Sequence, residues 1–245
     1  MNSSELKLRV AIHQPDFLPW LGFFNKIANS DTWIVLDHVK NNPRDAAFWG
    51  RRVKILVNKK PYWLGVKLEK PKIKNTIGIP INEMRIESPA INKYSEKLHI
   101  VRNAYTNAPF FDIAYPLVEA YFMDEDDNLA RRNMKFIRSV MNLLEINTKI
   151  IFSSEMSIET NKTQLLIDLL KKINATTYVC GGGADGYQQD LLFQQNGIEL
   201  KYNNFKHPVY KQGHNKDFEQ GLSVLDSLFW LPSLRVSEII HNSNL

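Results

Sequence analysis

Cysteine is almost absent from this 245-residue chain, in which Cys180 stands alone. A single cysteine excludes an internal disulfide and any metal site built from several cysteines. Long hydrophobic runs are missing too, since no apolar stretch reaches the roughly 18 residues of a membrane span. The first seven residues contain no apolar signal core. We therefore expect a cytoplasmic protein without a membrane span.

Acidic residues are scarce in one segment, although the net charge of the whole chain is only +5. Between Lys40 and Lys74 there are eleven Lys or Arg and only two acids, Asp45 and Glu69, so this segment carries +9 and the rest −4. A concentrated basic segment points to an anionic partner: a nucleotide-linked substrate, an acidic protein or nucleic acid. The alternative is a lysine-rich hairpin that is merely solvated.

The hydrophobic fraction of 44% is typical of a globular protein, and the length suits one large domain. Strand-like and helix-like segments alternate in the second half, which favours a parallel sheet. We predict an α/β fold: a mostly parallel sheet flanked by helices, with a helical middle segment and a small basic β-hairpin. Residues 1–245 form one domain, with sub-regions 1–87, 88–147 and 148–245.

The individual elements follow from periodicity and from turn residues. Strands are expected at residues 8–12, 33–36, 148–152, 176–180 and 198–202, and a hairpin at residues 53–57 and 62–68 with its turn at 58–61. Helices are expected to follow Trp20, to begin at Ser88, to cover residues 109–122, 128–144 and 163–173, to end near Phe193, and to begin at Ser223. At Ser223 the sequence resembles a capping box in which Asp226 replaces the usual glutamate.

Two predicted strands each end in a polar pair that contains a histidine. His13 and Gln14 follow the first strand, and Asp37 and His38 follow the second. If these strands are neighbours in a parallel sheet, the four residues converge at its carboxyl edge, where α/β proteins bind ligands. The helix that follows Trp20 would direct free backbone N–H groups toward the same place.

A glycine run, Gly181, Gly182 and Gly183, follows a predicted strand, and the stretch continues to Tyr187 before a short helix that ends near Phe193. Such glycines let the backbone approach a ligand and present N–H donors to an anion. The run matches neither a Walker loop nor a dinucleotide fingerprint. A flexible strand–helix turn is the alternative interpretation.

A second polar cluster, His207, Tyr210 and Gln212, follows the last strand. The proline after His207 restricts it to extended geometry, which suits a fixed site residue and equally suits a loop. No histidine pair has the spacing of a helical zinc site, so we expect no metal. Histidine acid–base chemistry is favoured, with Asp37 orienting an imidazole. Cys180 is interpreted as a buried strand residue rather than a nucleophile.

These residues together resemble the WbqC-like family, which is found among genes of bacterial surface-polysaccharide biosynthesis. The resemblance covers about residues 9 to 230. It rests on a His-Gln-Pro opening at His13, a Pro-Trp pair at Trp20, a Gly-x-Gly-Ala-x-x-Tyr element that starts at Gly181, and a His-Pro pair at His207. The chain departs from the family pattern at Cys180, where the family has serine.

The resemblance implies an enzyme that moves an acyl or aminoacyl group from a thioester, on an acyl carrier protein or CoA, to the amine of a nucleotide-linked amino sugar. Histidine would then take the amine proton, and the glycine turn would stabilise the oxyanion. We expect His13 as the base, Asp37 as its orienter, and His207 and Tyr187 as further catalytic residues. Substrate binding is expected from Gln14, Trp20, His38, Arg51, Gly181, Gly182, Gly183, Tyr210 and Gln212.

Three other functions stay open at this point. One is a nucleotidyl- or glycosyl-transferring enzyme, because the His-Pro opening is superficially like the nucleotide site of adenylyltransferases. Another is a non-catalytic scaffold of a biosynthetic complex. Nucleic-acid binding is permitted by the basic segment, although no recognition module is present.

Overall fold

The computed structural model describes residues 7–70, 78–87, 91–181, 189–213 and 217–241. Its centre is a five-stranded sheet in the order β7-β2-β1-β8-β9, and every neighbouring pair is parallel. The predicted fold class is thereby confirmed. Two further sheets contain two strands each, β3 with β6 and β4 with β5.

The central strands are β1 (Arg9–His13), β2 (Thr32–Val35), β7 (Lys149–Phe152), β8 (Thr177–Gly181) and β9 (Glu199–Asn203). The small strands are β3 (Lys40–Asn41), β4 (Arg52–Val57), β5 (Lys60–Gly65) and β6 (Ile79–Pro80). The α-helices are α1 (Leu21–Ala28), α2 (Ile91–Tyr105), α3 (Phe111–Met123), α4 (Leu129–Leu143), α5 (Lys162–Lys172), α6 (Asp190–Gln195), α7 (Val224–Trp230) and α8 (Ser233–His241). Two 3-10 turns, η1 (Ile81–Glu83) and η2 (Ser153–Glu155), complete the described elements.

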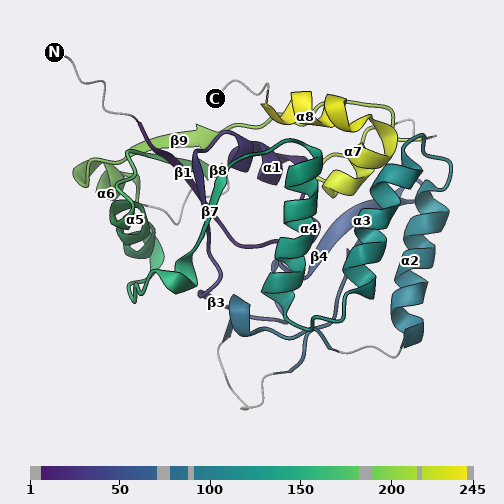
Figure 1. Cartoon of the computed structure of the whole chain (residues 1–245), viewed down its shortest axis with the longest axis horizontal. Helices are drawn as coiled ribbons and strands as arrows, with labels where there is room; N and C mark the ends of the chain where they lie inside the picture. The colour runs from purple at the N-terminus through teal and green to yellow at the C-terminus, as the bar shows by residue number, and fades with distance from the viewer. Residues whose placement is uncertain (1–6, 71–77, 88–90, 182–188, 214–216, 242–245) are drawn as a thin grey trace.

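The two faces of the central sheet are covered by different helices (Figure 1). Val10, Ile12 and Ile34 point to one face and pack with buried residues of α5 and α6. Ala11 and Trp33 point to the other face, where they join a larger core that includes α1. A strand covered on both faces is buried along its whole length instead of alternating, and all four residues of β2 are buried.

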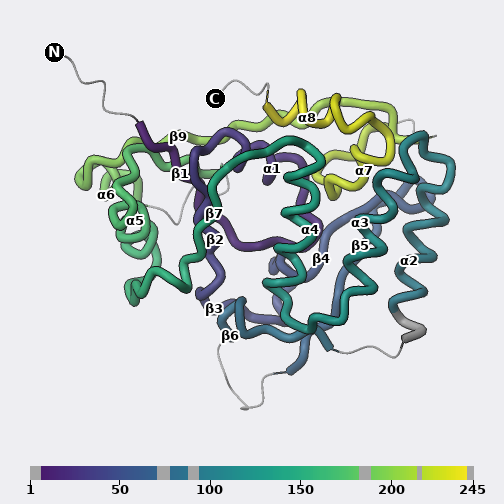
Figure 2. The backbone as a smooth tube through the Cα atoms, viewed as in Figure 1, coloured from purple at the N-terminus to yellow at the C-terminus, as the bar shows by residue number. Residues whose placement is uncertain are grey.

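The larger core continues away from the sheet into α2, α3, α4, α7 and the β4–β5 hairpin. The tube in Figure 2 follows this half of the molecule, in which the middle helices stand beside the hairpin. The hairpin turns at Asn58 and Lys59, both with positive φ, so its loop is two residues rather than the four expected. Among the described residues, no helix is long and apolar enough to cross a membrane.

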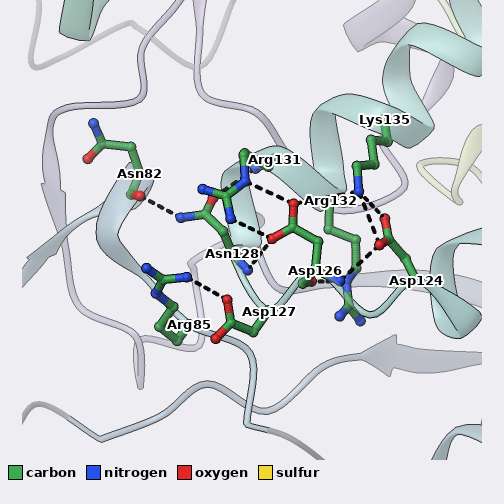
Figure 3. Close-up of polar contacts among 9 residues, drawn as sticks. All are labelled: Asn82, Arg85, Asp124, Asp126, Asp127, Asn128, Arg131, Arg132 and Lys135. Carbon is green, nitrogen blue, oxygen red and sulfur yellow. Dashed lines mark hydrogen bonds and ion pairs between the residues drawn. The ribbon is translucent and has the colours of Figure 1, made fainter.

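An acidic turn before α4 ties this helix to η1 (Figure 3). Asn128 caps α4 by accepting a hydrogen bond from the Arg131 N–H, and its amide donates to the Asn82 carbonyl. Beside it, Asp126 binds Arg131 through two hydrogen bonds, and Asp127 pairs with Arg85. The turn therefore fixes the position of η1 as well as the start of the helix.

The structure corrects two details of the sequence-based interpretation. Ser223 caps α7 as expected, but the Asp226 carboxylate binds Tyr105, Tyr210 and Gln212 instead of completing a capping box. Helix α8 was not expected, and it packs on α1, where the Asn25 side chain donates to the Ile240 carbonyl. The predicted helix start at Ser88 lies outside the described residues.

Candidate functional site at the carboxyl edge of the central sheet

Five chain segments leave the central sheet at its carboxyl edge. From β1 the chain builds the sheet outward through β2 and β7, and it then returns to add β8 and β9 on the other side of β1. The direction of growth therefore reverses between β1 and β8. Open parallel sheets bind ligands in the crevice at such a reversal. This edge is the natural place to look for a site.

The ends of β1 and β2 are brought together here, as the sequence predicted. His13 pairs with Val35 in parallel register, and the Leu36 N–H donates to the His13 carbonyl at 2.9 Å. Asp37 follows directly. The backbone therefore places the two polar pairs, His13–Gln14 and Asp37–His38, at the same edge of the sheet, as expected.

His13 is held as a neutral imidazole with an available acceptor. Its Nδ1 lies 3.0 Å from the carbonyl oxygen of Gln14. Because that oxygen can only accept, Nδ1 carries the proton and Nε2 carries the lone pair. Burial, with a further contribution from the Lys26 ammonium, lowers the pKa of His13 to about 3. Since 33% of the side chain is exposed, a ligand can reach it.

So low a pKa makes His13 a weak base, better suited to orienting a donor than to removing a proton. Two charged residues that the sequence analysis missed surround it. The Asp16 Oδ2 atom lies 3.7 Å from His13 Nδ1, and the Lys26 ammonium donates to the Ile12 carbonyl. Burial raises the pKa of Asp16 to about 7 and lowers that of Lys26 to about 8. The sequence does contain one sign of this site, because Lys26 falls on the apolar face of a short helix.

Asp37 serves a different histidine from the one predicted. In place of the expected pairing with His13, its carboxylate accepts from Ser153 Oγ at 3.0 Å and from Ser154 Oγ at 2.7 Å. Ser153 Oγ also lies 2.6 Å from Nδ1 of His38. The acid that faces His13 is Asp16. Asp37 is therefore a partner of His38, through a serine.

The hydrogen bonds of Ser153 determine the tautomer of His38. The hydroxyl accepts from the Asp37 backbone N–H and gives its one proton to the Asp37 carboxylate. Its remaining lone pair can only accept, so Nδ1 of His38 is the donor and Nε2 is left with the lone pair. A carboxylate that orients an imidazole in this way is a recurring device of acid–base catalysis.

The hydrogen-bonded series Asp37–Ser153–His38 is called the relay below. A pocket of about 250 Å³ opens beside it, between the ends of β2 and β7 and the turn η1. It is lined by His38, Pro80, Asn82, Glu83, Ser153, Ser154, Ser157, Ile158 and Glu159. Of the lining residues, sequence reasoning had identified only His38. The serines follow β7, and Asn82 and Glu83 reach the pocket through the tertiary contacts of η1, so no local pattern marks them.

His207 lies in an aromatic group. Its ring stacks on Trp20, with centroids 6.3 Å apart, and also contacts Phe205 and Phe218. Burial lowers its pKa. Trp20 is 38% exposed and lies over Gly22, where an added Cβ would come within 2.2 Å of the indole. Glycine at position 22 is thus required for the indole to occupy this place.

Tyr210 and Gln212 hold a buried carboxylate. The Asp226 Oδ1 atom accepts from the Tyr210 hydroxyl at 2.7 Å and from the Gln212 amide at 2.9 Å, while Oδ2 accepts from Tyr105. These bonds fasten the segment after β9 to α7 and α2. Both residues have a structural task here, and their predicted contact with substrate stays a prediction.

Arg51 lies beside Arg52 at the start of the hairpin. Arg51 donates to the Asp45 carbonyl, and Arg52 donates to the Ala46 carbonyl and packs 4.1 Å above the Trp63 ring. Burial and the neighbouring Arg52 lower the pKa of Arg51. The segment adjoins the end of β1, because the Phe17 N–H donates to the Trp49 carbonyl. Two guanidinium groups beside the sheet edge suit an anionic ligand.

The glycine turn is only partly described. Gly181 ends β8, whereas Gly182, Gly183 and Tyr187 lie outside the described residues. Cys180 is a buried residue of β8 within the core on the α5 side of the sheet, in agreement with its interpretation as a strand residue. In the described part of the chain, no three His, Cys, Asp or Glu side chains are grouped to hold a metal ion.

Comparisons with known proteins give one family and one relative. The model of the WbqC-like protein family matches residues 14–238. The uncharacterized protein Rv1507c of Mycobacterium tuberculosis (strain ATCC 25618 / H37Rv) is 28% identical over 222 residues, which cover 90% of this chain and 93% of the relative. No solved structure gives a significant match.

Proposed function

This chain belongs to the WbqC-like protein family, and from that premise we propose that it transfers an acyl or aminoacyl group to the amine of a nucleotide-linked amino sugar. The donor is a thioester on CoA or on an acidic acyl carrier protein. The observation that carries the proposal is the Asp37–Ser153–His38 relay beside a pocket at the carboxyl edge of the sheet. An oriented histidine can accept the proton that an amine loses on acylation.

The reaction needs a proton acceptor for the attacking nitrogen. The lone pair of the sugar amine forms a bond to the thioester carbonyl carbon, and the C–S bond breaks when the tetrahedral intermediate collapses. Nε2 of His38 takes the proton that the nitrogen loses and returns it to the departing thiolate. Asp37, acting through Ser153, stabilises the imidazolium that forms in between.

His13 has a separate task in this proposal. Its low pKa keeps the imidazole neutral throughout the pH range of the reaction, so Nε2 accepts a hydrogen bond from substrate and fixes its orientation. Positioning of this kind contributes through proximity and alignment rather than through proton transfer. Arg51 and Arg52 supply positive charge for the phosphates of the nucleotide.

The test is a transfer assay with acetyl-CoA or a glycyl carrier protein as donor and UDP-linked amino sugars as acceptors, with the amide product detected by mass spectrometry. Loss of a general base typically costs a factor of about 100 to 10,000. His38→Gln should therefore abolish transfer, and the exposed-site control His99→Gln should retain it. A wild-type rate in His38→Gln, or no product from any donor, would refute the proposal.

A matching assay separates the two histidines. His13→Ala should lower the apparent affinity for the acceptor and the rate, without removing the dependence of the rate on His38. A variant that transfers at the wild-type rate with unchanged affinity would show that His13 plays no part.

A further inference from the structure

The pocket beside His38 has walls that are fixed by the rest of the fold. On one side, the Asn82 N–H donates to the Asp37 carbonyl, and the Asn82 carbonyl accepts from Asn128 (Figure 3). On the other side, Ser153 and Ser154 are bound to Asp37. A site whose walls are held by buried hydrogen bonds presents its polar groups in a constant arrangement, which is what selective binding needs.

Three polar atoms of the residues that line this pocket are available as hydrogen-bond acceptors. The amide oxygen of Asn82 is buried and has no hydrogen-bond partner among the described residues. The Ser154 hydroxyl already gives its proton to Asp37, so it can only accept. Nε2 of His38 carries a lone pair, by the argument from Ser153. A ligand that satisfies these groups must bring donors.

Both charged residues in the described lining of the pocket are acidic. They are Glu83 and Glu159, both exposed, and no Lys or Arg is among the described residues that line the pocket. The arginines of the hairpin belong to a different part of the site. An acidic, acceptor-rich pocket favours a cation, and a protonated primary amine offers both the charge and three N–H donors.

The volume sets the size of the group. About 250 Å³ lies below the 300–1,000 Å³ typical of sites for drug-sized ligands, so this pocket can take a single ring and not a whole sugar nucleotide. Ser154 and Ser157 are among the lining residues, and hydroxyl groups of a sugar can bind serine hydroxyls.

We propose that this pocket is the subsite for the aminated sugar ring, in which Glu83, Glu159 and Asn82 select a charged amine over a hydroxyl and place it against Nε2 of His38. A bound ammonium group has no lone pair, so it first releases one proton to solvent; the neutral amine then attacks the thioester, and Nε2 of His38 takes the second proton. The identity of the ligand as a sugar nucleotide rests on the proposed function, whereas the selection of an amine does not. The nucleotide part of the substrate then lies outside the pocket.

The experiment measures the preference for an amine by calorimetry. UDP-sugars aminated at C2, C3 or C4 are each compared with the matching hydroxyl sugar. Ion pairs at an exposed rim are screened by water, so we expect a preference of about tenfold for at least one aminated sugar rather than more. The Glu83→Gln/Glu159→Gln variant should lose the preference while it still binds the hydroxyl sugars.

A matched control carries the same change in net charge outside the pocket. Glu87 and Glu155 are exposed and belong to the neighbouring segments, but neither lines the pocket. Glu87→Gln/Glu155→Gln should keep the preference. If wild type binds amino and hydroxyl sugars equally, or if the preference survives in Glu83→Gln/Glu159→Gln, the pocket is not an amine subsite, although the transferase proposal would stand.

If no sugar nucleotide binds, the proposed acceptor class is wrong, and the pocket is then judged with free glucosamine and glucose. The readout is the NMR signal of the His38 imidazole, assigned with His38→Gln. A shift caused by glucosamine alone, and lost in Glu83→Gln/Glu159→Gln, would support the amine subsite. Equal shifts with both sugars, or none with either, would overturn it.

Discussion

At the end of β1, His13 lies beside two buried residues, Asp16 and Lys26. At the end of the neighbouring strand β2, His38 binds Ser153, which in turn binds the Asp37 carboxylate. In the first place, burial without a strong partner keeps the imidazole neutral. In the second, the Asp37 carboxylate, bound through Ser153, can stabilise a protonated His38. The difference shows that the environment of a histidine at a strand end depends on the segment packed against it.

The largest effect is expected from removing the buried charge beside His13. Lys26→Met leaves the Ile12 carbonyl without its donor and Asp16 without a nearby cation, so the free energy of unfolding should fall by about 3 kcal/mol. The pKa of His13 should rise, because the Lys26 ammonium lowers it. Urea unfolding and NMR titration measure the two quantities.

The exposed-site variant Lys171→Met is the control for Lys26→Met, and it should change neither quantity. An unchanged pKa of His13 in a folded Lys26→Met protein would mean that burial alone accounts for the difference between the two histidines.

A pH series can test Asp16 in the same region. Its pKa is raised in the folded state to about 7, so between the unfolded value of 3.8 and about 7 the folded protein binds the extra proton. The carboxyl group therefore makes the protein less stable as pH rises through this window. Relative to Asp16→Asn, wild type should lose about 2 kcal/mol between pH 5 and pH 8.

Both proteins must be unfolded in urea at each pH, and only the change of their difference with pH is used. This removes the constant cost of the substitution itself. A difference that stays flat across pH 5 to 8 would contradict a raised pKa of Asp16.

The relay at the other histidine can be broken at one atom. Ser153→Ala removes the hydroxyl that joins His38 to Asp37, and because that hydroxyl is buried, the loss should cost about 1–2 kcal/mol of stability. The transfer rate should fall at least tenfold with little change in acceptor affinity. Ser227→Ala is the matched control, since Ser227 is also buried, its hydroxyl donates to the Val224 carbonyl, and it does not line the pocket.

Equal transfer rates in Ser153→Ala and Ser227→Ala would show that the link from Asp37 to His38 has no part in the reaction. The pH dependence of the rate gives a second readout. It should change in Ser153→Ala and stay the same in Ser227→Ala.

The smallest effect is expected from the cap that holds the pocket wall. Asn128→Ala removes the N-cap of α4 and the donor to the Asn82 carbonyl, which should cost about 1 kcal/mol. Amine preference at the His38 pocket should weaken, while the pKa of His13 should not move. Denaturant unfolding and sugar-nucleotide calorimetry measure these outcomes. A loss of amine preference without any change in stability would contradict the proposal that the N-cap of α4 holds the pocket wall.

The fold could be predicted from sequence because its strands are short apolar runs that end in recognisable polar residues. β1 and β2 were located to within a residue, and their convergence followed from parallel pairing. Turn chemistry was less reliable: Asn58 and Lys59 adopt positive φ and close a two-residue loop, which leaves Pro61 within β5. Proline is tolerated there because β5 is the edge of a two-stranded sheet.

The site was harder to predict, for a physical reason. Residue types at strand ends identified His13, Asp37 and His38, but their partners come from segments far away in the sequence. Ser153 lies more than a hundred residues after Asp37, and Glu83 lies on η1, which is held in part by the Asn128 side chain. Pairings of this kind arise from tertiary packing and leave no periodicity behind.

The position of β1 in the sheet also governs how the chain can fold during synthesis. β1 is made well before the neighbour on one of its sides, β8, which begins at Thr177. Until β8 has left the ribosome, one edge of β1 has its backbone N–H and C=O groups unpaired. Such an edge invites pairing with other chains. We therefore expect this protein to depend on slow, late closure of its sheet, and truncation before β8 to yield aggregates rather than a smaller domain.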